Sequence, residues 1–264
     1  MISIEKFVNV FLICSCLCGC SVRNSNEYRS QMIFNIKKHG AVCFDYTNGK
    51  TTVEIIKESN TEKSVPSPLV ATNQHPIKIE SVKHLAKMIH GRRVIFYTGA
   101  GISSGVIPTM NELLKDLGDT EQLINNVTKN PEKYIQILNN FFKKCEMAEP
   151  TRAHIALHSI ISKTGSLLIT ENIDLLHQKS GDIPLTRGNF SESHEELADA
   201  DYVVAIGLSS DESGLLRLYK KLNPNGIIIA INTSKNIEYL SNKDFILQKD
   251  AQVIISEMLK WINH

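Results

Sequence analysis

Cysteine is scarce in most of this 264-residue sequence. Six cysteines are present, and four of them lie within the first twenty residues, at positions 14, 16, 18 and 20. Only Cys43 and Cys145 follow, and no Cys-x-x-Cys pair occurs after residue 20. A four-cysteine zinc site is therefore excluded. A disulfide between Cys43 and Cys145 stays open, but nothing in the sequence requires it.

The sequence also lacks an excess of either charge. It has 29 Lys and Arg against 28 Asp and Glu, a formal net charge of +1. This balance gives no indication of a nucleic-acid surface or of a surface for acidic ligands. There is no internal repeat and no low-complexity tract. The length allows one α/β domain with appendages and a sizeable core.

The one apolar run near the N-terminus, residues 7–17, is too short to span a bilayer as a helix. Lys6 precedes it, and Leu17-Cys18-Gly19-Cys20 closes it. This pattern resembles the lipobox of bacterial lipoproteins and predicts a signal peptide over residues 1–20, with Cys20 as the lipidated residue. We therefore expect a membrane-anchored protein of the cell envelope. The alternative is an uncleaved apolar N-terminus or a misplaced start codon, and then a cytoplasmic protein.

Residues 21–78 carry signals for a tether, a β-hairpin and a linker. Two alternating stretches, 41–44 and 51–56, flank Asn48-Gly49, a dipeptide favoured in hairpin turns. Pro66, Pro68 and Pro76 then stand among Ser, Thr and Asn, as in a linker. The sequence assigns this N-terminal extension no function.

From residue 79 to residue 264 the pattern indicates strands that alternate with helices. Strands are predicted at 94–97, 166–170, 202–206, 227–231 and 245–248, and helices at 82–89, 112–117, 120–127, 131–145, 153–162, 195–200, 215–222 and 251–262. Such alternation implies right-handed crossovers and an α/β fold with a Rossmann-like, doubly wound parallel sheet. Ligands of such sheets lie at the carboxyl ends of the strands, here residues 99–103, 171–174, 207–210 and 232–233.

The first of these strand ends holds a glycine turn. Gly99 and Gly101 allow a tight turn and a close approach of a ligand to the backbone. Thr109 and Glu112 have the spacing of a capping box at the start of the next helix. A strand, a glycine turn and a helix N-terminus together favour a phosphate site. Glycine turns that only reverse the chain are common, so that alternative stays open.

Six short motifs, in this order and spacing, resemble those of the sirtuins, the NAD-dependent protein deacylases, over residues 79–259. The two most specific are Gly-Ala-Gly-Ile-Ser at residues 99–103 and Thr-Glu-Asn-Ile-Asp-Leu-Leu-His at residues 170–177. The others are Pro-Thr-Arg-Ala-His-Ile-Ala-Leu at residues 150–157, Gly207-Leu208-Ser209, Ile231-Asn232 and Asp250-Ala251. The resemblance implies a sirtuin-like fold that binds NAD.

Carried over by position, the resemblance implies a cofactor site. Gly99, Ala100 and Gly101 would hold the pyrophosphate, Ser209 would bond a phosphate, and Asn232 would bond the adenosine ribose. Asn172 and Asp174 would hold the nicotinamide ribose and carboxamide, and Ser103, Gly207 and Ala251 would complete the cofactor site. An amide both donates and accepts, and a buried carboxylate accepts from the carboxamide NH₂, so the chemistry of Asn172 and Asp174 suits this role. Both residues also favour simple turns. His154 and His177 are expected to be structural.

Several family features are missing. Arg187-Gly188-Asn189 stands where the family has His-Gly-Asn or His-Gly-Ser, and an arginine stays protonated and cannot replace the general-base histidine. Residues 109–111 replace Asp-Phe-Arg, and Glu171 replaces a glutamine. The zinc ribbon is absent, and residues 190–192 are at most an echo of the family's Phe-Gly-Glu, so we expect no metal and a small or absent second lobe.

The sequence thus favours NAD or ADP-ribose binding, with cleavage of the nicotinamide–ribose bond as the family's chemistry. The acceptor would be an acyl-lysine, water or a protein side chain. Water agrees best with the loss of the segment after the zinc ribbon, because hydrolysis needs no peptide channel. The alternatives are a catalytically inactive NAD or ADP-ribose sensor that presents a surface to a partner, and a relic with an empty crevice. Arg187 favours the inactive forms, whereas Asn172 and Asp174 favour an enzyme or a sensor.

Overall fold

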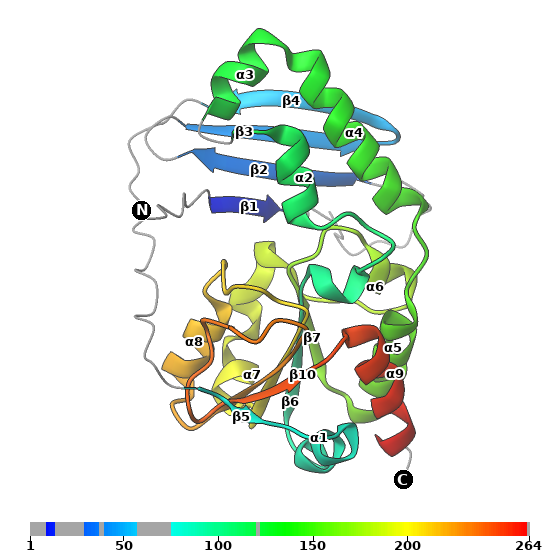
Figure 1. Cartoon of the computed structure of the whole chain (residues 1–264), viewed down its shortest axis with the longest axis vertical. Helices are drawn as coiled ribbons and strands as arrows, with labels where there is room; N and C mark the ends of the chain where they lie inside the picture. Colours follow the sequence, from blue (N-terminus) through cyan, green and yellow to red (C-terminus); the bar gives the residue numbers. More distant parts are fainter. Residues whose placement is uncertain (1–8, 14–28, 37–39, 57–74, 120–121, 263–264) are drawn as a thin grey trace. The chain divides into compact units, whose positions relative to one another are not determined.

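The computed structural model describes residues 9–13, 29–36, 40–56, 75–119 and 122–262, which belong to two units (Figure 1). One unit combines Met1–Ser64 with Ile107–Met147, and the other combines Val65–Val106 with Ala148–His264. The sequence predicts a single domain from residue 79 onward. The structure instead places residues 107–147 in the first unit, so the chain leaves the second unit after residue 106 and returns at residue 148.

The first unit contains a four-stranded antiparallel sheet in the order β1-β2-β3-β4. Its strands are β1 (Asn9–Ile13), β2 (Arg29–Ile36), β3 (Gly40–Thr47) and β4 (Lys50–Ile56). The predicted hairpin is present as β3 and β4, and positive φ angles of 48° at Asn48 and 84° at Gly49 fit the two-residue turn that joins them. Strand β1 lies within the segment expected to be a signal peptide. Cys20 and most of the proline-rich linker lie outside the described residues.

Three helices complete the first unit: α2 (Met110–Leu117), α3 (Leu123–Lys129) and α4 (Pro131–Met147). The predicted capping box of Thr109 and Glu112 begins α2. Helix α4 packs on the sheet, where Phe142 stacks on Tyr46 with ring centroids 5.2 Å apart. The Tyr46 hydroxyl donates to Glu146 on the same helix. The apolar stripe of α4 is thus core, as its helical spacing predicts.

The structure describes two cysteines of this unit, Cys43 and Cys145, and both are buried. Burial, followed by the nearby Asp45 carboxylate, raises the pKa of the Cys43 thiol to about 12. A thiol so protonated is a poor nucleophile. The disulfide left open by the sequence is not formed in the structure.

The second unit contains the predicted parallel sheet, in the order β5-β10-β9-β8-β6-β7. Its strands are β5 (Ile77–Lys78), β6 (Val94–Thr98), β7 (Leu167–Thr170), β8 (Tyr202–Ile206), β9 (Ile227–Asn232) and β10 (Phe245–Gln248), and each pairing is parallel. Every residue of β6 is buried, as expected for a strand covered on both faces.

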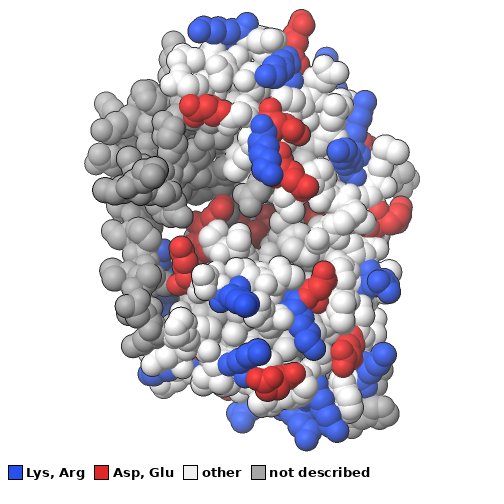
Figure 2. Space-filling view, viewed as in Figure 1, with Lys and Arg blue, Asp and Glu red and all other residues white. Residues whose placement is uncertain are grey.

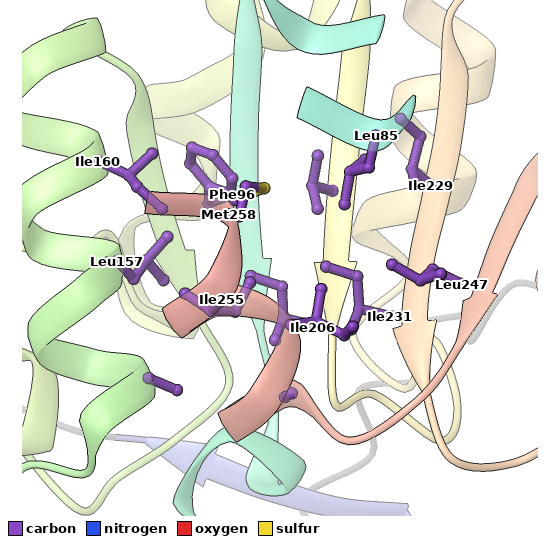
Figure 3. Close-up of a cluster of buried hydrophobic side chains, with 14 of the residues drawn as sticks. Leu85, Phe96, Leu157, Ile160, Ile206, Ile229, Ile231, Leu247, Ile255 and Met258 are labelled. Atoms are coloured by element: carbon purple, nitrogen blue, oxygen red, sulfur yellow. The ribbon is translucent and has the colours of Figure 1, made fainter. Parts of the chain in front are cut away.

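Helices cover both faces of this sheet. On one face lie α1 (Val82–Ile89), α5 (Arg152–Thr164) and α9 (Ala251–Ile262), and their side chains interlock with those of the strands (Figure 3). On the other face lie α7 (His194–Asp199) and α8 (Leu215–Leu222). The short helices α6 (Leu176–Lys179), η1 (Ala100–Ser103) and η3 (Arg187–Ser193) occupy the connections. The result is the three-layered, doubly wound fold that the sequence predicts.

A buried carboxylate ties β10 to its neighbours. Asp244 is fully buried and accepts hydrogen bonds from the backbone N–H groups of Ile228 at 2.8 Å and Ser241 at 2.9 Å, and from Lys220 Nζ at 2.5 Å. A buried charge is tolerated only when it is paired and hydrogen-bonded in this way. Asp244 thus holds the turn before β10 against the start of β9.

Charges of both signs are interspersed on the visible face of the described surface (Figure 2). This mixture agrees with the net charge of +1. Among the residues that the structure describes, no helix is long and apolar enough to cross a membrane.

The strand order reverses next to β6, because β7 lies on one side of it and β8 on the other. At this switch point the backbones of Gly101 and Gly207 touch. A Cβ atom added to Gly101 would lie 2.6 Å from Gly207 Cα, and one added to Gly207 would lie 2.6 Å from Gly101 Cα. Gly207 also has a φ of 66°, which favours glycine. Glycine at 101 is therefore required by the protein's own packing.

Gly101→Ala should destabilise the second unit by about 1–3 kcal/mol, because the new methyl group overlaps backbone atoms that cannot rotate away. The measurement is the free energy of unfolding in urea. Gly165→Asn is a matched control, since Gly165 ends α5 in the left-handed region with open space around it, and asparagine tolerates that conformation. Equal stability of Gly101→Ala and the parent protein would contradict the close approach.

Candidate functional site

The glycine turn after β6 uses most of its own N–H groups within the protein. Gly99 donates its N–H to Ile206 O at 2.9 Å, and Gly101 donates to Gly207 O at 3.0 Å. Both were predicted to bind pyrophosphate through these groups. Among the described residues, the N–H of the exposed Ala100 has no acceptor. The turn therefore offers a ligand one free donor where the sequence predicts three, because the ends of β6 and β8 bond to each other.

Asn172, Asp174 and Ser103 form one hydrogen-bonded network, although Ser103 follows β6 and the other two follow β7. Ser103 Oγ donates to Asp174 Oδ2 at 2.5 Å, and Asn172 Nδ2 lies 3.4 Å from Ser103 Oγ and 3.2 Å from Gly99 O. Asp174 also accepts from Leu176 N at 3.0 Å and is 4% exposed. The structure thus brings together three predicted site residues. Asn172 is the more accessible, being half-buried.

The remaining predicted cofactor residues differ in how they are used. Ser209 is exposed after β8. Asn232, at the end of β9, donates through Nδ2 to Leu208 O at 2.6 Å and accepts from Ser234 N at 2.9 Å, so its amide shapes the loop that carries Ser209. Ala251 is the first residue of α9, and its side chain packs in the core. A ligand would therefore contact its backbone and not its side chain.

The segment that leads to Arg187 runs beside β7. Leu185 forms a parallel bridge with Ile169, and Thr170 N donates to Leu185 O at 2.9 Å. Thr186 N then donates to Asn189 Oδ1 at 2.7 Å and starts η3. The backbone of Arg187 therefore follows a segment paired with β7, the strand that leads to Asn172 and Asp174. The Arg187 side chain lies outside the described part of the chain.

Tyr97 and Glu171 form a second polar pair at the strand ends, which the motifs of the sequence do not predict. The buried Tyr97 hydroxyl donates to Glu171 and lies 2.9 Å from Ser213 Oγ. Phe190 meets the Tyr97 ring edge-on, with centroids 6.2 Å apart. Burial, reinforced by the Glu171 charge, raises the pKa of Tyr97 well above its ordinary value, which keeps the phenol a donor. The bulky polar residue within the apolar run of β6 is the one sequence signal for this pair.

A further carboxylate, Asp211, serves a structural purpose in the loop after β8. It accepts from Leu216 N and Arg217 N, each at 3.0 Å, and so caps the start of α8. Burial raises the pKa of Asp211 despite these bonds. Its oxygens are committed to the helix.

A histidine cluster lies behind the strand ends. His177 Nε2 is 2.8 Å from Thr98 Oγ1, and His154 Nδ1 is 2.7 Å from Thr151 Oγ1. The two rings are 4.6 Å apart, and both side chains are buried. Burial, followed by the neighbouring His177, lowers the pKa of His154 to about 3. These contacts agree with the structural role expected for both residues.

No group of three or more His, Cys, Asp or Glu side chains is arranged to hold a metal ion among the residues that the structure places.

Acid should destabilise the protein through His154. Its pKa in the folded state is about 3, against about 6.5 in an unfolded chain. The unfolded state therefore binds more protons between these values, and stability falls as the pH falls. From pH 6.5 to 4.5 the loss due to this residue should be about 2–3 kcal/mol.

The measurement is urea unfolding at both pH values for the parent, for His154→Gln, which cannot titrate, and for His84→Gln on the exposed side of α1. The His84 variant should match the parent, whereas the His154 variant should lose less stability on acidification. The same loss of stability in all three proteins would contradict the lowered pKa of His154.

No family model matches the chain. Stretches of the chain are similar to curated proteins. Over 113 residues it is 32% identical to an NAD-dependent protein deacylase of Desulfosudis oleivorans, which covers 38% of this chain and 41% of that protein. Over 131 residues the chain is 29% identical to an NAD-dependent protein deacetylase of Caldivirga maquilingensis, covering 47% of this chain and 51% of that one. The chain thus spans about two fifths to one half of the length of these relatives.

Solved structures of Sir2 homologues share the fold. A Sir2 homolog–NAD complex superposes with a TM-score of 0.58 at 20% identity, over 72% of this chain and 96% of that one. A Sir2 protein bound to acetylated peptide superposes with a TM-score of 0.55 at 15% identity, over 68% of this chain and 98% of that one. At such low identity these structures bear on the fold alone. Together, the sequence relatives and the shared fold confirm the resemblance to the sirtuin family that the motifs predict.

Proposed function

We propose that this chain binds NAD or ADP-ribose at the carboxyl ends of β6, β7, β8 and β9 and cleaves the nicotinamide–ribose bond of NAD, with water as the acceptor. The observation that carries the proposal is the network of Ser103, Asn172 and Asp174. It joins the ends of β6 and β7 beside the point where the strand order reverses, which is where ligands of such sheets bind. The names of the relatives, which are NAD-dependent deacylases, support the same substrate.

The groups at these strand ends fit a dinucleotide. Ala100 offers a free N–H and Ser209 an exposed hydroxyl, and both suit phosphate oxygens. Asn172 offers a half-buried amide next to the buried carboxylate of Asp174, which suits the nicotinamide half. NAD supplies a nicotinamide leaving group, whose departure leaves positive charge on the ribose. Asn172 and Asp174 would hold that ribose and orient it.

The sequence favours water over an acyl-lysine as the acceptor in this reaction. Arg187 stands where the sirtuins have their general-base histidine, and most of the segment that helps to build their acyl-lysine channel is missing. Hydrolysis needs no such channel. Transfer of ADP-ribose to a protein side chain is a further outcome of the same bond cleavage. The second candidate, a sensor that binds NAD or ADP-ribose without turnover, is favoured by Arg187.

The parent protein should bind NAD with micromolar to millimolar affinity, about −4 to −8 kcal/mol. Asn172→Ala should weaken binding about tenfold, because it removes an amide that bonds to Gly99 and Ser103 and would contact the ribose. Isothermal titration calorimetry measures both. Asn225→Ala is the matched control, since Asn225 is exposed before β9, at the opposite edge of the sheet.

Nicotinamide release and deacylation of an acetyl-lysine peptide should be followed in the same samples. We expect nicotinamide release without appreciable deacylation. Binding without release would favour the sensor, and no heat at millimolar NAD would overturn the proposal altogether.

We also propose that Cys20 anchors the protein to a membrane. The support is the short apolar run that ends in Leu17-Cys18-Gly19-Cys20. One acyl chain binds membranes only marginally, whereas the several chains of a lipoprotein anchor it firmly.

Expressed in a bacterium, the protein should fractionate with membranes and incorporate labelled palmitate, and Cys20→Ser should abolish labelling. Cleavage before Cys20 would remove residues 9–13, so the mass of the mature protein is an independent check. A soluble, unlabelled, full-length product would refute the anchor.

A further inference from the structure

Carboxylates at the strand ends differ in how accessible they are. Asp174 is 4% exposed and is bonded to Ser103 and Leu176. Asp211 is committed to the first turn of α8. Glu171 is half-buried, as Asp211 is, and it lies at the end of β7, one residue before Asn172. The Glu171 side chain is therefore more accessible than that of Asp174.

Glu171 is also held in place. Its backbone N–H donates to Thr98 O at 2.9 Å, which extends the pairing of β6 with β7 by one residue. Its side chain accepts from the hydroxyl of Tyr97, which is fully buried and fixed in turn by Ser213 and Phe190. A charge fixed in advance stabilises a transition state without a cost of reorganisation.

We propose that Glu171 is a catalytic residue, the base that activates water for cleavage of the nicotinamide–ribose bond. This inference rests on the proposed function. Glu171 accepts a proton from water while the water oxygen forms a bond to C1′ of the ribose. The C1′–N bond breaks, and nicotinamide leaves as a neutral molecule with the electron pair of that bond. The products are ADP-ribose, nicotinamide and the proton, which Glu171 later releases to solvent.

The chemistry of this position agrees with such a role. A carboxylate stabilises the positive charge that develops on a sugar ring as its leaving group departs, and a carboxylate also serves as the base for water in glycoside hydrolysis. A glutamine, which the sirtuin motif has at this position, accepts no proton at neutral pH. The change from glutamine to Glu171 therefore supplies a base in a chain that has Arg187 in place of the histidine.

The test compares the full-length parent protein with Glu171→Gln, using NAD as the probe and measuring both binding by calorimetry and nicotinamide release. Glu171→Gln keeps the size and most of the hydrogen bonding of the side chain. It should lower kcat for release by about 10²–10⁴-fold, the usual loss on removal of a general base. Affinity for NAD should change by less than about threefold. Glu171→Asp, which keeps the charge, should retain more activity than Glu171→Gln.

Glu212→Gln is the matched control, because Glu212 is an exposed carboxylate in the nearby loop after β8. It should release nicotinamide at the parental rate. Thermal unfolding of each variant identifies any loss of fold. Parental release by a folded Glu171→Gln protein would overturn the inference alone. A parent that binds NAD without releasing nicotinamide would overturn the proposed cleavage and, with it, the inference. A parent that does not bind NAD would overturn the proposed function itself.

Discussion

The close approach of Gly101 and Gly207 is the constraint on which the candidate site depends. These two residues lie at the start of the connections that follow β6 and β8, the strands on either side of the switch point. Because their backbones touch, the glycine turn bonds to the end of β8 through Gly99 and Gly101. The turn is thereby set in position before any ligand arrives. Its direction then brings Ser103 to Asp174 and leaves the N–H of Ala100 open.

The polar groups of the site are bonded to one another, and this affects how a ligand would bind. Ser103 and Asn172 already share a hydrogen bond, and Asn232 is bonded at both ends of its amide. A ligand that takes one of these groups exchanges an existing bond for a new one, so the net gain from each contact is small. Preorganisation, rather than the number of contacts, is the advantage of such a site.

The sequence predicts the layers of the fold well, because they follow from local patterns. The apolar runs of β6, β8 and β9 predict a buried parallel sheet, Asn48-Gly49 predicts the hairpin, and Thr109 with Glu112 predicts the start of α2. It also predicts the meeting of Asn172, Asp174 and the glycine turn, since all follow parallel strands.

What the sequence does not predict depends on side-chain direction and on long-range pairing. Nothing local shows that the Tyr97 hydroxyl reaches Glu171, 74 residues away, or that the N–H groups of Gly99 and Gly101 are used by β8. The late Asp-Ala motif likewise gives no sign that Ala251 faces the core. Helix α4 packs on the N-terminal sheet through the stacking of Phe142 on Tyr46, and the local sequence pattern of neither residue predicts this long-range contact.

That pairing has a consequence for synthesis of the chain. Strands β3 and β4 leave the ribosome long before α4, which covers them in the folded unit. Until residue 147 has emerged, side chains such as Phe44 and Tyr46, fully buried in the finished protein, have no helix to pack against. Antiparallel hairpins form within microseconds, whereas translation adds about 5–20 residues per second. The nascent sheet therefore spends seconds with an uncovered apolar face, the kind of transient surface that is prone to aggregate.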